Sequence, residues 1–170
     1  MKKALVVGIN DYKSCSLNGC INDAKDVESA ISRNEDGTVN FSVKTMFDVQ
    51  TKGCLRNAVE DCFSGDIDIA LFYFSGHGYI DSFGGYLVTP DFTNGDFGLS
   101  MQELLTIVNN SRCKNKVVIL DCCHSGMMGN MQTGNQNTAV ISEGVTLLTA
   151  SKKDESSVEV NGHGVFTSLL

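Results

Sequence analysis

The feature that most constrains the fold is a pair of apolar segments, each of strand length and each followed directly by small residues. The first, IALFYFS at 69–75, leads into GHG at 76–78, and the second, KVVILD at 116–121, leads into CCHSG at 122–126. Unbroken apolar runs of this length are typical of strands that are covered on both faces of a parallel sheet. The carboxyl ends of such strands meet at one edge, where open α/β folds place their sites. We therefore expect a turn after each run, and both turns at one edge of the sheet.

The rest of the chain alternates between strand and helix patterns. Further strands are expected over residues 4–9, 39–47 and 145–150. Helices are expected over residues 19–34, after a cap at Thr51, and after a capping box formed by Ser100 and Glu103. A hairpin is expected over residues 78–91, with its turn at 83–85. The apolar face expected for the helix after Thr51 consists of Cys54, Leu55, Ala58, Val59 and Cys62. The apolar face expected for the helix after the capping box consists of Met101, Leu104, Leu105 and Val108. This order predicts an α/β fold with a doubly wound, mostly parallel central sheet, flanking helices and a small β-hairpin. At 170 residues the chain is expected to form one domain.

Composition narrows the class of protein. The net charge of −7 argues against a nucleic-acid partner. No run of 18 apolar residues is present, which argues against a membrane span, and the first twelve residues resemble a first strand rather than a signal peptide. The seven cysteines are odd in number, irregularly spaced and without a C-x-x-C pair, so neither a disulfide framework nor a structural zinc site is expected. These features predict a cytoplasmic protein that requires no metal.

The two junctions bring an imidazole and a thiol to the same edge. A cysteine attacks a carbonyl group as its thiolate, which needs a base close by, and His77 is positioned to supply one. Successive strand residues point to opposite faces, so only one of Cys122 and Cys123 can meet the histidine, and strand geometry alone does not say which. The flanking Gly76 and Gly78 let backbone N–H groups come close to a substrate. The expected chemistry is nucleophilic catalysis.

The motifs SGHG at 75–78 and DCCHSG at 121–126 resemble those of the caspase and metacaspase cysteine peptidases. Positions 77 and 123 are 46 residues apart, close to the separation of about 50 found in caspases. The segment VVGINDYKSCSLNGCINDA at 6–24 resembles the start of metacaspases, with the prokaryotic metacaspase-like members nearest. The resemblance continues through 146–151 and 164–170 and so covers nearly the whole chain.

The resemblance implies a cysteine endopeptidase with a Cys–His dyad that cleaves after Arg or Lys. It assigns the base to His77 and the nucleophile to Cys123, and it assigns the oxyanion donors to the backbone N–H groups of Gly78 and Cys123. The substrate-binding pocket that metacaspases use for a basic residue falls on Cys20, Asp23, Ser75 and Asp121. The implied partner is a protein or peptide substrate.

Some alternatives stay open. Asp23 is also compatible with a solvated carboxylate at a helix start, and Asp121 with a strand-end group that accepts from nearby backbone N–H groups. A caspase-like pocket for aspartyl substrates would instead use Lys152 or Lys153. A non-catalytic caspase-like regulatory module is the alternative from another class, although the presence of both reactive residue types favours an enzyme.

The resemblance also divides the domain, which covers residues 1–170. Residues 1–126 correspond to a large subunit, 127–144 to a flexible loop and 145–170 to the start of a small subunit that is truncated here. We therefore expect an additional domain or chain to complete the fold and regulate activity. No cofactor is required, but Asp81 and Asp91 are candidate remnants of the site found in calcium-responsive metacaspases, so a calcium site is a further possibility.

Overall fold

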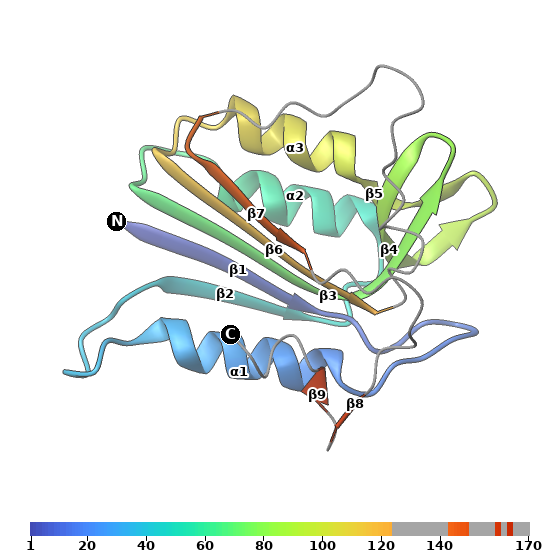
Figure 1. The fold of residues 1–170 in the computed structure, drawn as a ribbon, viewed down its shortest axis with the longest axis horizontal. Helices are drawn as coiled ribbons and strands as arrows, with labels where there is room; N and C mark the ends of the chain where they lie inside the picture. The colour runs from blue at the N-terminus through green and yellow to red at the C-terminus, as the bar shows by residue number, and fades with distance from the viewer. Residues whose placement is uncertain (124–142, 150–158, 161–162, 165–170) are drawn as a thin grey trace.

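A mostly parallel sheet forms the centre of the protein (Figure 1), of which the computed structural model describes residues 1–123, 143–149, 159–160 and 163–164. The seven-stranded sheet has a parallel part and an antiparallel extension. The parallel part follows the order β2 (Ser42–Phe47), β1 (Lys2–Gly8), β3 (Ile69–Asp81), β6 (Asn115–Cys123) and β7 (Val145–Thr149). The expected α/β class is confirmed.

Helices cover both faces of this sheet. Helix α1 (Cys20–Ser32) lies on one face, and α2 (Lys52–Cys62) and α3 (Met101–Asn110) lie on the other, as Figure 1 shows. Alternating side chains of the strands divide the core accordingly. On the α1 side, the buried cluster contains Ala4, Val6, Ala24, Val27, Leu71, Tyr73 and Ile119. The larger cluster on the other side includes Leu5, Val7, Phe72, Phe74, Leu120 and residues of α2 and α3. The sheet is therefore doubly wound, as expected.

The predicted caps begin α2 and α3. The Thr51 side chain accepts a hydrogen bond from the Cys54 backbone N–H at 3.2 Å, and Ser100 and Glu103 form the reciprocal capping box. All four apolar residues expected on α3 are buried. On α2 the expectation was wrong for Cys54, which is exposed. The buried residues of α2 are Leu55, Ala58, Val59 and Cys62, a spacing of three and four residues that leaves position 54 beside the stripe.

The first of the two expected turns is absent. Strand β3 does not end at the SGHG motif but continues to Asp81, because its ladder with β6 gives way at Gly78 to an antiparallel ladder with β4 (Gly84–Thr93). The expected hairpin is present, but it turns at residues 82–83 rather than at 83–85, and there the Asp81 carboxylate accepts from the backbone N–H groups of Phe83 and Gly84. A third strand, β5 (Asp96–Ser100), which the sequence did not reveal, pairs with β4.

The remaining described segments are short. Strands β8 (Glu159–Val160) and β9 (His163–Gly164) pair with each other in antiparallel fashion. Most of the expected loop at 127–144, Lys152 and Lys153, and the segment 165–170 lie outside the described residues. No helix within the described ranges is long and apolar enough to cross a membrane.

Candidate active site

The two strands that carry the reactive residues are neighbours, and their register pairs the expected dyad. His77 on β3 is the Cα partner of Cys123 on β6. Neighbouring strands lie about 4.8 Å apart, so the two backbones approach each other closely at this point. Two strands that are distant in the sequence therefore bring the expected base and the expected nucleophile to one position at the carboxyl edge of the parallel sheet.

Strand alternation separates the two adjacent cysteines. Cys122 is buried, with 4% of its surface exposed, and it belongs to the core cluster on the side of α2 and α3 together with Phe74. Ile119 belongs to the cluster on the α1 side. Because successive residues of a strand face opposite sides of the sheet, positions 119, 121 and 123 of β6 share the α1 side, and position 122 belongs to the side of α2 and α3. This arrangement identifies Cys122 as a core thiol and leaves position 123 as the candidate nucleophile.

The His77 ring is held through one of its nitrogen atoms. Nε2 lies 2.6 Å from the backbone carbonyl oxygen of Cys15. A carbonyl oxygen only accepts hydrogen bonds, so Nε2 carries the hydrogen, and in the neutral ring Nδ1 is the acceptor nitrogen. The contact thereby selects the tautomer of a general base and fixes the orientation of the ring.

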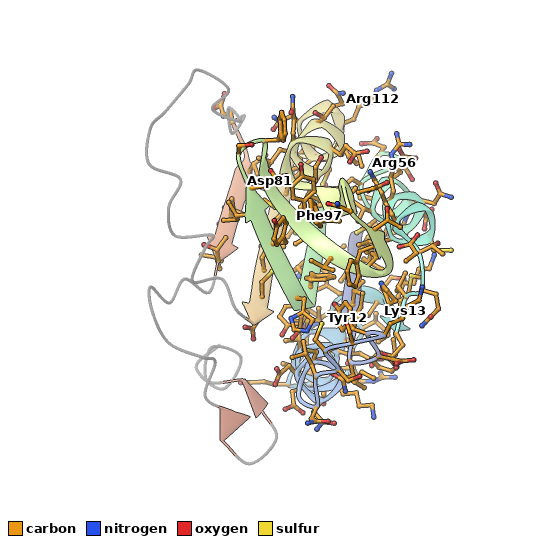
Figure 2. All side chains as sticks on the ribbon, turned by 90° about the vertical axis from the view of Figure 1, so that its right-hand side faces the viewer. Tyr12, Lys13, Arg56, Asp81, Phe97 and Arg112 are labelled. Atoms are coloured by element: carbon orange, nitrogen blue, oxygen red, sulfur yellow. The ribbon has the colours of Figure 1, made fainter. Side chains whose placement is uncertain are left out.

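Tyr12, a core residue that Figure 2 labels, supports the same histidine. Its ring centroid lies 4.6 Å from that of His77, and its hydroxyl accepts the His77 backbone N–H at 3.0 Å. The hydroxyl donates in turn to the Val88 carbonyl oxygen at 3.3 Å on β4. Burial raises the pKa of Tyr12 far above its usual range, so the group stays a neutral hydroxyl. Tyr12 thus joins the loop after β1 to both strands of the hairpin.

The loop that carries Tyr12 and Cys15 is anchored at both ends. The Asp48 carboxylate accepts from the backbone N–H groups of Asn10 at 2.8 Å and Asp11 at 2.9 Å. The Asn10 side chain accepts from the backbone N–H of Cys20 at 3.0 Å, where α1 begins. Sequence reasoning assigned no role to this loop. The available signal was its position, directly after the carboxyl end of a third buried strand.

The four residues expected to form the pocket lie close together in the fold. Ser75 on β3 is the register partner of Gly8 on one side and of Asp121 on the other. The first turn of α1 covers Gly8 so closely that an added Cβ would lie 2.5 Å from the Cys20 carbonyl oxygen. All four are buried: Ser75 at 0%, Cys20 at 1%, Asp23 at 2% and Asp121 at 6% exposure. The structure thus places two acidic side chains, one from α1 and one from β6, on the side of the sheet to which Ser75 belongs.

Ser75 has an unused hydrogen-bonding group. Its Oγ is fully buried and, among the described residues, has no hydrogen-bond partner. A buried polar atom left in this way costs about 1–3 kcal/mol, so such an atom indicates a missing partner. Together with the carboxyl groups of Asp23 and Asp121, the hydroxyl suits a ligand that is positively charged and donates hydrogen bonds.

The other expected roles have a less direct basis in the structure. Gly78 follows His77 on β3 and pairs with Leu87 on β4, and the oxyanion role of its N–H and that of Cys123 stay predictions. The Asp91 carboxylate accepts from Thr89 Oγ1 at 2.6 Å and from the Lys52 backbone N–H at 3.1 Å, where α2 begins. Within the described part of the chain, no three His, Cys, Asp or Glu side chains gather as a metal site would require. The calcium site stays a prediction as well.

The fold is thus a doubly wound, mostly parallel α/β sheet whose register pairs a histidine with a cysteine at its carboxyl edge. The family model of the caspase domain matches residues 1–170, the whole length of the chain. The chain therefore belongs to the caspase-domain family of cysteine peptidases. A comparison with curated proteins gave no match.

Proposed function

We propose that the protein is a cysteine endopeptidase that cleaves peptide bonds after Arg or Lys, with His77 as the base and Cys123 as the nucleophile. The observation that carries this proposal is the register of β3 and β6, which pairs positions 77 and 123 at the site edge. The second support is the contact between His77 Nε2 and the Cys15 carbonyl oxygen, which leaves Nδ1 as the nitrogen that takes up a proton.

The proposed reaction proceeds in two steps. His77 Nδ1 takes the thiol proton, and the Cys123 sulfur attacks the carbonyl carbon before the scissile bond. The backbone N–H groups of Gly78 and Cys123 stabilise the oxyanion that forms. His77 then gives its proton to the leaving amine, and the carbon–nitrogen bond breaks to leave a thioester. Water, deprotonated by His77, hydrolyses the thioester and restores the thiol.

The hydrogen bond to Cys15 matters most while the imidazole is charged. The imidazolium ion formed in the first step carries a hydrogen on each nitrogen, and the Cys15 carbonyl accepts the one on Nε2. Tyr12 holds the His77 backbone in place, so the ring does not have to reorganise during the reaction. Both groups act through His77 and need no contact with the substrate.

The pocket supports a basic residue before the cleaved bond. Asp23 and Asp121 supply negative charge, and the Ser75 hydroxyl supplies an acceptor that the described residues leave unused. Arg presents five N–H donors in a planar fork, which suits carboxylate partners, and Lys presents three. An aspartyl side chain would be repelled by the same carboxylates, which disfavours the alternative specificity.

A set of peptides that differ only in the residue before the cut tests this proposal. The wild type should cleave arginyl and lysyl peptides and leave aspartyl peptides intact, and Cys123→Ala should cleave none of them. Preferred cleavage after aspartate would overturn the basic specificity and direct attention to Lys152 and Lys153. Absence of cleavage for every residue tested would favour the non-catalytic regulatory module.

We further infer a metacaspase-like member of the family, on the resemblance of residues 6–24 to the metacaspase start. On this view residues 1–126 correspond to a large subunit and residues 145–170 to part of a small subunit. The substrate would be a protein or peptide in the cytoplasm, and a further domain or chain would regulate the site.

A further inference from the structure

Three aromatic rings, one each from β3, β4 and β5, form a cluster beyond His77. Tyr79 on β3 lies with its ring centroid 4.1 Å from that of Phe97 on β5, and Tyr86 on β4 lies 5.5 Å from Phe97 and 6.5 Å from Tyr79. These separations are typical of aromatic pairs in contact. All three side chains are partly exposed. Partly exposed rings in mutual contact present an apolar surface that a ligand can touch. Figure 2 labels Phe97, the member of the cluster on β5.

The cluster is held on a rigid frame. Tyr79 and Tyr86 are register partners, and the Asp81 carboxylate closes the hairpin turn by accepting from the Phe83 backbone N–H. Strand β5 approaches β4 closely at Gly98, where an added Cβ would lie 2.2 Å from the Leu87 carbonyl oxygen. The three rings therefore need little ordering when a ligand binds, which favours affinity.

The cluster continues the proposed catalytic site along a single strand. Ser75, His77 and Tyr79 follow one another at every second position of β3, about 6.6 Å apart, and Tyr79 packs against the core cluster on the side of α2 and α3. This spacing is close to that of two residues in an extended substrate. Ser75 belongs to the pocket for the residue before the cut, and His77 protonates the amine that leaves. Tyr79 lies on the far side of His77 from Ser75, which is the side of the leaving group.

We propose that Tyr79, Tyr86 and Phe97 form a binding subsite for an apolar or aromatic substrate side chain within the first two residues after the cleaved bond. This inference rests on the proposed peptidase function and adds a second determinant of specificity to it. Substrates would thus be selected by a basic residue before the cut and an apolar residue after it.

Internally quenched peptides test this subsite. Each peptide keeps Arg before the cut and carries Phe, Leu, Ser or Asp at the two following positions in turn. The wild type should cleave the Phe and Leu peptides with a kcat/KM about tenfold above that for Ser, a discrimination of the size that one apolar pocket supplies. Tyr79→Ala should abolish that discrimination and keep the requirement for Arg. Equal rates in the wild type for all four residues at both positions would overturn the subsite.

Further variants guard against a merely structural effect. Tyr79→Phe keeps the ring and should keep the discrimination, and Phe97→Leu keeps bulk but removes a ring and should reduce it. Phe83→Ala is the matched control, because Phe83 lies at the turn of the same hairpin and is 87% exposed. It should behave as wild type, and loss of discrimination in this variant would overturn the assignment to the cluster.

Cleavage of no arginyl or lysyl peptide would defeat the proposed function itself. Cleavage after Arg that is indifferent to the following residues would defeat only the subsite.

Discussion

The hydroxyl of Tyr12 accepts the backbone N–H of His77 at 3.0 Å, and the rings of the two residues lie with centroids 4.6 Å apart. The same hydroxyl donates to Val88, so one side chain joins three segments at the proposed catalytic base. The backbone of His77 is thereby fixed by Tyr12, while its ring is fixed by Cys15. The position of the base depends on a residue that is not expected to touch the substrate.

Tyr12→Phe keeps the ring and removes the hydroxyl. The His77 N–H and the Val88 carbonyl oxygen then lose a partner, so we expect the free energy of unfolding to fall by about 1–3 kcal/mol. We expect kcat on an arginyl peptide to fall about tenfold with little change in KM, because the substrate pocket is intact. Tyr73→Phe, which removes a hydroxyl from another fully buried tyrosine, is the control. An unchanged kcat in a less stable Tyr12→Phe would show that Tyr12 serves only the core.

Gly76 is the residue that makes room for Tyr12. An added Cβ at Gly76 would lie 2.6 Å from Tyr12 Oη and 2.8 Å from Phe74 Cζ. We therefore expect Gly76→Ala to displace the tyrosine, lower the melting temperature and reduce kcat. Gly53→Ala is the matched control, since nothing lies within 4 Å of its added Cβ and Ala is a better helix former by about 0.5–1 kcal/mol. A fully active and stable Gly76→Ala would contradict the close contact.

Asp121→Asn tests the charge of the pocket. The substitution removes one negative charge and keeps the shape, so kcat/KM for an arginyl peptide should fall by the equivalent of about 2–5 kcal/mol. The variant Asp26→Asn, an exposed carboxylate one turn along α1 from Asp23, should leave kcat/KM unchanged. A similar loss in both variants would show a general effect of net charge rather than a pocket.

The buried thiol of Cys62 makes the free energy of unfolding fall as pH rises in the alkaline range. Burial raises the pKa of Cys62 from its usual value of about 9 to about 12. Between these values the unfolded thiol has lost its proton and the folded thiol has kept it, so this group's contribution to stability falls as pH rises, by about 1.4 kcal/mol per pH unit. Urea unfolding should show a smaller alkaline loss for Cys62→Val than for wild type, with a constant difference below about pH 8. Parallel curves above pH 9 would contradict this origin.

The fold was predictable because strand and helix signals agree along the chain. The apolar runs that became β3 and β6, the Thr51 cap and the Ser100–Glu103 box are local signals with few alternatives. The continuation of β3 through Gly76 and Gly78 was not predictable, because glycine is usual in turns. The ladder with β4, a pairing that depends on tertiary structure, decides the conformation there.

One part of the candidate site was predictable from the sequence, and another part was not. Strand alternation already required that only one of Cys122 and Cys123 could meet His77, and the structure places Cys122 in the core. The roles of Tyr12 and of the Cys15 carbonyl were not accessible. They depend on the path of the loop after β1, and a backbone carbonyl is common to every residue, so the residue type does not reveal its role.

The assignment of His77 and Cys123 is tested most directly by active-site labelling. A peptidyl-arginyl acyloxymethyl ketone alkylates the catalytic thiolate of a cysteine peptidase, and tandem mass spectrometry then locates the added mass. We predict a single addition at Cys123, unchanged labelling of Cys122→Ala, none of Cys123→Ala, and labelling of His77→Ala slower by about a hundredfold or more. Addition at Cys122 or Cys15, or undiminished labelling of Cys123→Ala, would contradict the proposed dyad.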